Sequence, residues 1–183
     1  MKLTTAAHNI VRQHIPAGGF AIDATAGNGH DTLFLATCVG PEGHVFAFDT
    51  QHHAIANTRQ RVTGAHLDTR VTLICASHTE LVERLPPDCR QRVSAVMFNL
   101  GYLPGGDKAV TTQLDSTLVA LEAAMQILSD NGVLSVMAYR GHAGGISEFA
   151  GVASWVSAQQ ARYGLIAHQE SPNGGPAWWL LSR

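Results

Sequence analysis

Residues 21–32 read Ala-Ile-Asp-Ala-Thr-Ala-Gly-Asn-Gly-His-Asp-Thr, and this stretch decides the fold. An apolar strand ends at Asp23, a Gly-x-Gly turn follows at Gly27 and Gly29, and a helix begins near Asp31. The glycines permit a tight turn and the close approach of a ligand to the main chain. The unpaired N–H groups at a helix N-terminus attract a carboxylate or a phosphate. The stretch therefore predicts a loop that binds a nucleotide-type cofactor.

Two features of this region separate the candidate cofactors. A dinucleotide fingerprint has a third small residue where this chain has Thr32. The carboxylate of Asp23 would repel a pyrophosphate but suits the amino group and sulfonium of S-adenosylmethionine (SAM). A second strand ends at Asp49, where an acidic side chain accepts hydrogen bonds from the ribose hydroxyls of either cofactor. The pattern favours SAM, and NAD stays the alternative.

The composition describes a globular protein. The 183 residues are 45% hydrophobic and 14% charged, which predicts one domain over residues 1–183. The N-terminus lacks the apolar region of a signal peptide, and no apolar run reaches the about 18 residues of a membrane span. The three cysteines are odd in number and widely spaced. We therefore expect a cytoplasmic protein with no membrane partner.

The charge balance bears on nucleic-acid binding. The formal net charge is −2, whereas proteins that embrace a long duplex usually carry a basic surplus. A small RNA-binding surface is the alternative that the charge allows, and two subunits of a homodimer could share it. Its phosphate contacts would come from a local basic cluster, with Lys2, Arg12, Lys108 and Arg140 as candidates.

Strand and helix patterns alternate along the whole chain. Helices are expected near residues 4–14, 31–39, 50–62, 78–85, 114–128 and 146–156, and strands near 20–24, 44–49, 70–76, 93–98, 133–139, 163–169 and 177–181. Five βα units followed by a terminal strand pair predict an α/β fold. The expected form is a single Rossmann-like, doubly wound sheet that is mostly parallel with an antiparallel edge strand.

Polar residues follow four of the predicted strands. Asp23, Asp49, the pair 77–78 (Ser77 and His78) and Asn99 all stand at carboxyl ends. Ligands of doubly wound sheets bind at that edge. This convergence predicts a single ligand site there.

The loop after the fourth strand, residues 99–106, carries candidates for catalysis. The amide oxygen of Asn99 can accept a hydrogen bond from a substrate amine, and the ring of Tyr102 can stack on a planar group. Methyl transfer is an in-line displacement, so holding the nitrogen against the methyl group supplies most of the catalysis. The alternative is a turn-forming asparagine and a packing tyrosine.

Histidines are numerous but do not form a metal motif. His142, after the fifth strand, is a candidate general base, and the alternative is a loop histidine bonded to the backbone. None of the histidines has zinc-ligand spacing with the cysteines, so no metal site is expected.

Three motifs resemble one protein family. D-A-T-A-G-N-G-H-D-T at 23–32, F-N-L-G-Y-L-P-G-G-D-K at 98–108 and Y-R-G-H-A-G-G at 139–145 are similar to the small class I SAM-dependent methyltransferases described as rRNA methylases. That family includes the MnmM-type tRNA methyltransferases. The resemblance implies N-methylation of the 5-aminomethyl group on the wobble (2-thio)uridine, in the anticodon region of tRNA. It also implies a SAM site of Asn28, Asp31, Asp49, Gln51, Ser77 and His78, with Asn99 and Tyr102 beside the acceptor.

The chain departs from the family pattern in two loops. Ala143 stands where proline is expected, the pair 146–147 is less polar than usual, and the connection 173–177 lacks a Pro-Pro pair. Both loops are expected to face the acceptor. The alternatives to the tRNA reading are another RNA, a small amine metabolite, and a SAM- or nucleotide-binding module without catalysis.

Overall fold

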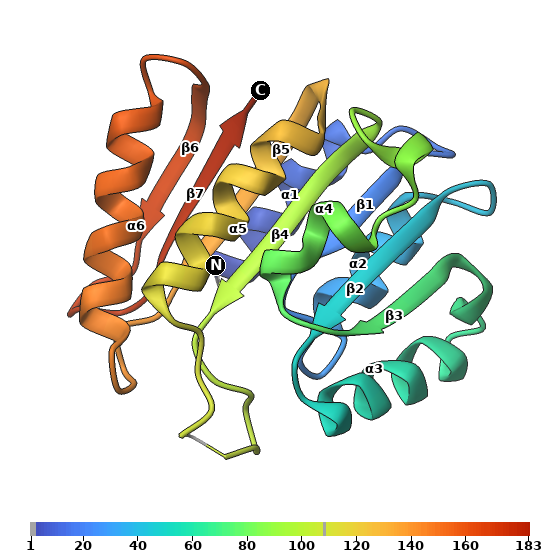
Figure 1. The fold of residues 1–183 in the computed structure, drawn as a ribbon, viewed down its shortest axis with the longest axis horizontal. Helices are drawn as coiled ribbons and strands as arrows, with labels where there is room; N and C mark the ends of the chain where they lie inside the picture. The colour runs from blue at the N-terminus through green and yellow to red at the C-terminus, as the bar shows by residue number, and fades with distance from the viewer. Residues whose placement is uncertain (1–2, 108) are drawn as a thin grey trace.

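The computed structural model describes residues 3–107 and 109–183, and its strands form one sheet (Figure 1). The strands are β1 (Phe20–Asp23), β2 (His44–Asp49), β3 (Val71–Cys75), β4 (Val93–Leu100), β5 (Leu128–Ala138), β6 (Gly164–Glu170) and β7 (Ala177–Ser182). Their order is β3-β2-β1-β4-β5-β7-β6. Strands β1 to β5 are parallel, and β7 runs antiparallel to both of its neighbours. The predicted fold class is confirmed, and β7, inserted between β5 and β6, is the strand that reverses direction.

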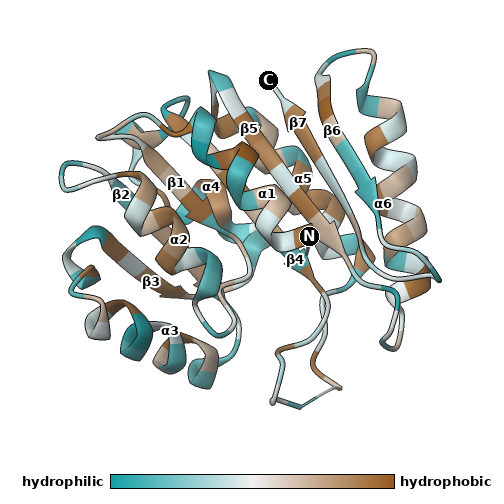
Figure 2. Ribbon diagram, turned by 180° about the vertical axis from the view of Figure 1, so that it is seen from behind, coloured by the Kyte–Doolittle hydropathy of each residue, from teal (hydrophilic) through white to brown (hydrophobic). Residues whose placement is uncertain are grey.

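Helices cover both faces of the sheet (Figures 1 and 2). On one face lie α1 (Leu3–Val11) and α2 (His30–Cys38), with α3 (His52–Gly64) beside α2. On the other face lie α4 (Leu81–Arg84), α5 (Leu114–Ile127) and α6 (Gly145–Gln159). Short 3₁₀ turns complete the chain at Arg12–His14, Asp68–Arg70, His78–Glu80 and Pro87–Cys89.

The apolar strands place a core on each side of the sheet. Because successive residues of a strand face opposite ways, Trp178 and Trp179 of β7 enter different cores. Trp178 is fully buried and its indole N–H donates to the hydroxyl of Ser135 at 2.9 Å. Trp179 packs against Phe149 of α6 on the other side. The helices on both faces are thereby fixed to one sheet.

Three local patterns in the sequence predict features that the structure does not show, namely a helix cap at Thr50, an apolar helix face that includes Ile146, and a turn at residues 130–132 before the next strand. Thr50 does not cap the following helix: α3 begins at His52, with Gln51 at its N-cap and no side-chain cap bond. Ile146 is 73% exposed and does not belong to the buried face of α6. The turn expected at 130–132 lies inside β5, where the register with β4 shifts. Tertiary packing determines these three features, and the intrinsic helix and strand propensities of the residues do not predict them.

Among residues 3–107 and 109–183, every helix is too short or too polar to cross a membrane. The parallel strands end at the lower edge of the sheet in Figure 1, and the loops after β1, β2, β3, β4 and β5 gather there.

Candidate functional site

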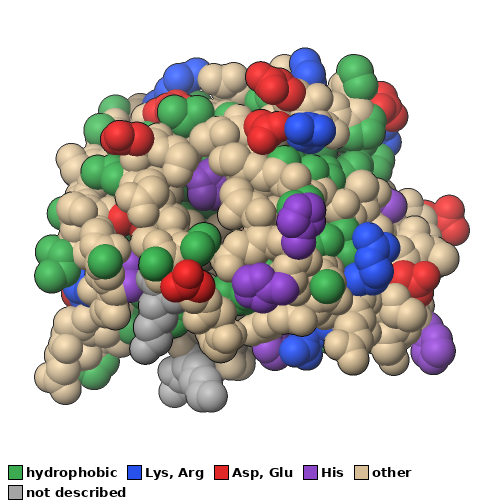
Figure 3. Space-filling model, turned by 60° about the horizontal axis from the view of Figure 1, so that its bottom comes forward, with side chains coloured by type: hydrophobic (Ala, Val, Ile, Leu, Met, Phe, Trp, Pro, Cys, Tyr) green, Lys and Arg blue, Asp and Glu red, His purple; other side chains and the backbone are tan. Residues whose placement is uncertain are grey.

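A cavity of about 950 Å³ lies at the carboxyl ends of the parallel strands. Its walls come from α1, from the loops after β1 to β5, and from the connection between β6 and β7. Ligand pockets span about 300–1,000 Å³, so this one has room for more than one small molecule. Figure 3 views this end of the molecule and shows histidine, acidic and apolar side chains interspersed over the described surface. The cavity lies at the edge of the sheet where the sequence predicts a ligand site.

Asp49 is held at the cavity wall by backbone amides. Its carboxylate oxygens accept hydrogen bonds from the N–H of Gly27 and the N–H of Gln51, each at 2.9 Å. Gly27 has a φ of 53°, a left-handed conformation that favours glycine and that turns its N–H toward β2. Each carboxylate oxygen keeps a further lone pair. Asp49, Gly27 and Gln51 all line the cavity, and Asp49 can accept hydrogen bonds from a ligand's hydroxyl groups.

Asp23 lies beneath the cavity and does not line it. It is fully buried, and its carboxylate accepts hydrogen bonds from the N–H of Thr25 at 3.1 Å and from the hydroxyl of Thr32 at 2.6 Å. The prediction that Asp23 meets a cationic ligand directly is therefore wrong. The carboxylate instead holds the end of β1 to the first turn of α2.

The raised pKa of Asp23 makes the stability of the fold depend on pH, and this dependence can be tested. Burial, reinforced by the neighbouring Asp31 carboxylate, raises the pKa of Asp23 to about 7 from its ordinary value of 3.8. Because the folded state then holds the proton more tightly, this group's stabilising effect is full below pH 3.8 and is lost as the pH rises through about 7. Asp23→Asn stays neutral, so its melting temperature relative to wild type should rise between pH 5 and pH 8. Parallel melting curves with no pH-dependent difference would contradict this.

Gly29 also acts through packing and does not line the cavity. Its φ is 77°, and a Cβ atom there would lie 2.8 Å from the Cα of Thr58 in α3. The neighbouring Asn28 does line the cavity and ties loops together. Its side-chain amide donates to the carbonyl of Pro104 at 3.0 Å and its amide oxygen accepts from Asn57 at 3.0 Å. The glycine turn is thereby joined to α3 and to the loop after β4.

The pair that follows β3 combines a helix cap and a buried ring. The hydroxyl of Ser77 accepts the N–H of Thr79 at 3.2 Å and begins the 3₁₀ turn. His78 is 9% exposed, and burial lowers the pKa of its imidazole, so the ring is neutral at pH 7. One side of this ring bonds the backbone of Ala24. Its Nε2 is buried without a protein partner among the described residues, and both side chains line the cavity. The wall here can take a hydrogen bond from a ligand.

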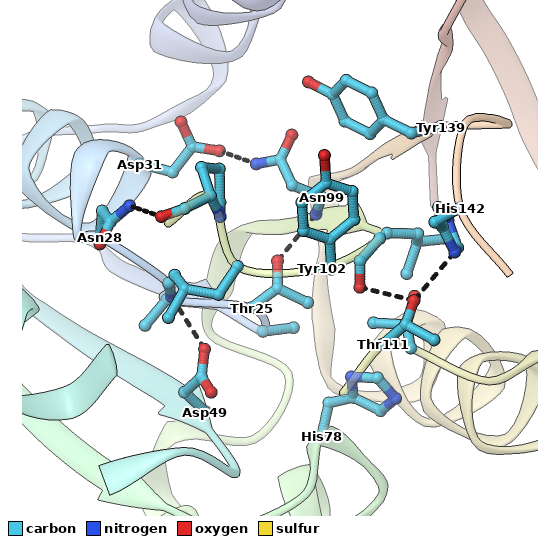
Figure 4. Close-up of a pocket in the computed structure, with 18 of the residues that line it drawn as sticks. Thr25, Asn28, Asp31, Asp49, His78, Asn99, Tyr102, Thr111, Tyr139 and His142 are labelled. Carbon is cyan, nitrogen blue, oxygen red and sulfur yellow. Dashed lines mark hydrogen bonds between the residues drawn. The ribbon is translucent and has the colours of Figure 1, made fainter. Parts of the chain in front are cut away.

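Asn99 is fixed at both its backbone and its side chain (Figure 4). Its N–H donates to the hydroxyl of Thr25 at 2.8 Å, and its side-chain Nδ2 donates to the Oδ2 of Asp31. Because a carboxylate only accepts hydrogen bonds, the bonded atom must be the amide nitrogen. The amide oxygen is then the atom of Asn99 left to accept from a ligand in the cavity.

His8 completes this arrangement, and the sequence did not reveal it. Its Nε2 lies 2.7 Å from the Oδ1 of Asp31, and it lines the cavity from α1. The contact joins residues 23 positions apart. Neither helical periodicity nor a motif could signal it.

Tyr102 lines the cavity from the loop after β4. It forms an isolated antiparallel bridge with Thr111, which closes this loop into a hairpin-like excursion. The ring lies edge-on to that of His142, with centroids 6.3 Å apart. Tyr139, labelled beside it in Figure 4, donates its hydroxyl to the sulfur of Met137 at 3.2 Å, and burial raises the pKa of the phenol. Two aromatic rings therefore flank the region next to Asn99.

His142 lines the cavity, but one of its ring nitrogens is bonded to the loop and the other is enclosed. Its Nδ1 lies 2.9 Å from the hydroxyl oxygen of Thr111 and 3.0 Å from the carbonyl of Ala143. Its Nε2 is buried, lies 4.0 Å from Glu148, and lacks a hydrogen-bond partner within the described residues. The side chain is only 2% exposed. This geometry favours the alternative of a loop histidine bonded to the backbone, and the general-base role stays a prediction.

Glu148 of α6 holds the segment between β4 and α5, and the sequence analysis did not identify it. This acid is 2% exposed, and its carboxylate accepts hydrogen bonds from the hydroxyls of Thr112 at 2.7 Å and Thr117 at 2.6 Å. A buried carboxylate without a nearby motif carries no sequence signal. Its role is to fix the loop that carries Tyr102.

The predicted basic cluster is not assembled as expected. Arg140 donates to the carbonyl of Gly175 and to the carboxylate of Glu170, each at 2.6 Å, and its guanidinium lies 3.4 Å from the ring centroid of Phe149. It therefore ties the β6–β7 connection to α6, and its assignment to phosphate binding stays a prediction. Arg12 is exposed on the 3₁₀ turn Arg12–His14 that follows α1, whereas Lys2 and Lys108 fall outside the described residues. In the described part of the chain, no group of three potential ligands could hold a metal ion.

Comparisons with known proteins place the chain in a family. A family model described as "Putative rRNA methylase" matches residues 45–177. Over 155 residues the chain is 41% identical to the "tRNA (mnm(5)s(2)U34)-methyltransferase, chloroplastic" of Arabidopsis thaliana, an alignment that covers 80% of this chain. It covers 56% of the plant protein, so the chain spans about half the length of that curated relative.

Two solved structures resemble the whole chain. A "putative rRNA-methylase" from Clostridium thermocellum superposes with a TM-score of 0.92 at 35% identity, covering 100% of this chain and 97% of that one. A "putative methyltransferase" from Streptococcus mutans in complex with SAH (S-adenosylhomocysteine) superposes with a TM-score of 0.86 at 29% identity, covering 100% and 98%.

Proposed function

The chain belongs to the rRNA methylase family of SAM-dependent methyltransferases, and from this premise we propose that it methylates tRNA. The proposed acceptor is the 5-aminomethyl group of the wobble (2-thio)uridine. The plant relative is named for this modification, and the relative from S. mutans was solved with SAH, the demethylated form of SAM. The observation that carries the proposal is the fixed amide of Asn99, whose oxygen is oriented to receive an amine N–H at the cavity wall.

The cavity fits SAM on the chemistry of its own groups. The carboxylate of Asp49, held by two amides, suits the two ribose hydroxyls. The Nε2 of His78 is buried without a partner in a residue that lines the cavity, and we propose that it accepts from an exocyclic amino group such as that of adenine. We assign the remaining contacts to Asn28, Asp31, Gln51 and Ser77, which line the same cavity.

The reaction needs orientation more than acid–base chemistry. SAM supplies an electrophilic methyl group on its sulfonium. The amine lone pair forms the new N–C bond as the S–C bond breaks, and the nitrogen loses one proton. Asn99 holds the amine through its amide oxygen, and Tyr102 offers a ring on which the uracil can stack. An alkylamine must be neutral to attack, and we propose that water takes the proton, because the nitrogens of His142 are enclosed.

A tRNA substrate implies that the protein acts in a compartment where tRNA is modified. We propose the cytoplasm, although the plant relative is named as chloroplastic. A homodimer stays a prediction. With its predicted basic cluster only partly available, the chain would bind the anticodon region through few phosphates and mainly through the nucleoside in the cavity.

Nucleoside analysis of tRNA from cells lacking this protein tests the function. We expect the 5-methylaminomethyl form of wobble uridine to disappear and the 5-aminomethyl form to accumulate, with recovery on complementation. An unchanged content of the methylated nucleoside would contradict the proposal.

A further inference from the structure

A side chain from the N-terminal helix reaches the acceptor end of the cavity. His8 of α1 lies against Phe34 of α2, with ring centroids 3.8 Å apart and planes within 1° of parallel. Its Nε2 lies 2.7 Å from Asp31, and its side chain is 25% exposed against 10% for Asp31. The stack and the hydrogen bond together define one orientation of this ring. His8 lies outside residues 45–177, which match the family model.

The hydrogen-bond directions follow from the chemistry of the partners. A carboxylate accepts and cannot donate, so the Nε2 of His8 carries the hydrogen. The other oxygen of Asp31 accepts from the Nδ2 of Asn99. Two donors from different elements, α1 and β4, therefore meet at one carboxylate on α2. Each oxygen of Asp31 has one of them, which leaves the carboxylate plane little freedom to rotate.

We infer that His8 is a positioning residue that sets the orientation of the Asn99 amide through Asp31. The inference rests on the proposed function, in which the amide oxygen of Asn99 receives the substrate amine. If Asp31 loses its donor from α1, its carboxylate can rotate about the Cβ–Cγ bond. The amide of Asn99 can then follow the carboxylate or turn over and present N–H groups, which repel an amine N–H. The N-terminal helix thereby belongs to the acceptor site as well as to the scaffold.

Two substitutions separate the hydrogen bond from the ring stack. His8→Phe keeps an aromatic ring against Phe34 but removes the donor. His8→Gln removes the ring but places an N–H near the position of the imidazole Nε2. We expect His8→Phe to lower kcat about 10-fold and to weaken SAM binding by less than that, because the Asn99 amide acts on the reacting geometry while Asp31 is one of several proposed SAM contacts. His8→Gln should recover most of that loss. The same Phe substitution at His14, which does not line the cavity, is the matched control.

A mutant cycle tests the route through Asn99. If His8 acts through that amide, His8→Phe should change kcat little in an Asn99→Ala background, although it lowers kcat in wild type. Additive losses would overturn the route. So would full activity of His8→Phe together with a loss in His8→Gln, since that result assigns His8 to packing alone.

A crystal structure of His8→Phe gives a readout that needs no substrate. We expect the carboxylate of Asp31 or the amide of Asn99 to adopt a different rotamer, and unchanged rotamers of both would overturn the inference. Absence of methyl transfer to tRNA by the wild-type protein would instead contradict the proposed function. The two failures are therefore distinguishable.

Discussion

Asn99→Ala should lower kcat for methyl transfer by about 100-fold while SAM affinity changes by less than about threefold. The amide oxygen positions the amine only when the substrate is bound, and its loss affects the displacement geometry more than cofactor binding. The backbone bond from residue 99 to Thr25 does not depend on the side chain, so the loop after β4 should keep its path. Single-turnover kinetics and calorimetry on the same preparation measure the two quantities.

Asn131→Ala is a suitable control for this substitution. Asn131 is exposed in the register shift near the start of β5, away from the carboxyl edge of the sheet. Asn131→Ala should match wild type both in the rate of methyl transfer and in SAM affinity. Full turnover by Asn99→Ala would remove Asn99 from the acceptor site.

Asp49→Ala should weaken SAM binding by about 10- to 100-fold, because charge-assisted hydrogen bonds typically contribute about 1.5–3 kcal/mol. The carboxylate also orients the N–H groups of Gly27 and Gln51, so its loss loosens the glycine turn as well. Isothermal titration with SAM measures the affinity. A melting curve establishes that the variant is folded.

Asp49→Asn separates the two contributions of this side chain. Its amide oxygen can keep one of the backbone bonds while the charge is lost, so we expect an affinity between those of Asp49→Ala and wild type. Asp68→Ala, a change at an exposed acid on another turn, is the control and should bind SAM normally. Unchanged SAM affinity in a folded Asp49→Ala protein would remove the ribose assignment.

The sequence predicted the fold because strands and turns of this sheet are encoded locally. Alternating apolar runs and glycine turns gave the order of elements, and the family motifs gave SAM as the cofactor, which the comparisons confirm. Because the cofactor of this family is SAM, the alternative of an NAD-dependent enzyme is excluded. Asp49, Ser77, His78 and Asn99 were identified because each stands at or close to the carboxyl end of a strand, and the structure brings them to one cavity.

The errors share a physical cause, which is that sequence position does not reveal burial. Asp23 follows the same rule as Asp49, yet it lies beneath the turn, where its carboxylate is fully buried and bonded to Thr25 and Thr32. His142 and Arg140 follow β5 as the pattern predicts, but one ring nitrogen of His142 is bonded to Thr111 and the Arg140 guanidinium to Gly175 in neighbouring loops.

The contacts that were missed join distant segments. His8 meets Asp31 only because α1 and α2 pack on the same face of the sheet. The buried Glu148 meets Thr112 only because α6 packs beside α5. Such pairs are decided by tertiary packing, so a single sequence carries no signal for them.

The most direct test of the function is methyl transfer by the purified protein. Wild-type protein is incubated with methyl-labelled SAM and tRNA that carries 5-aminomethyl-2-thiouridine at the wobble position, and the digested nucleosides are analysed by mass spectrometry. We expect label in 5-methylaminomethyl-2-thiouridine, stoichiometric with the wobble position, and none in tRNA that lacks the aminomethyl group. Equal transfer to the free nucleoside would identify a small-amine enzyme, and absence of label from the wobble nucleoside, with SAM bound normally, would contradict the tRNA account.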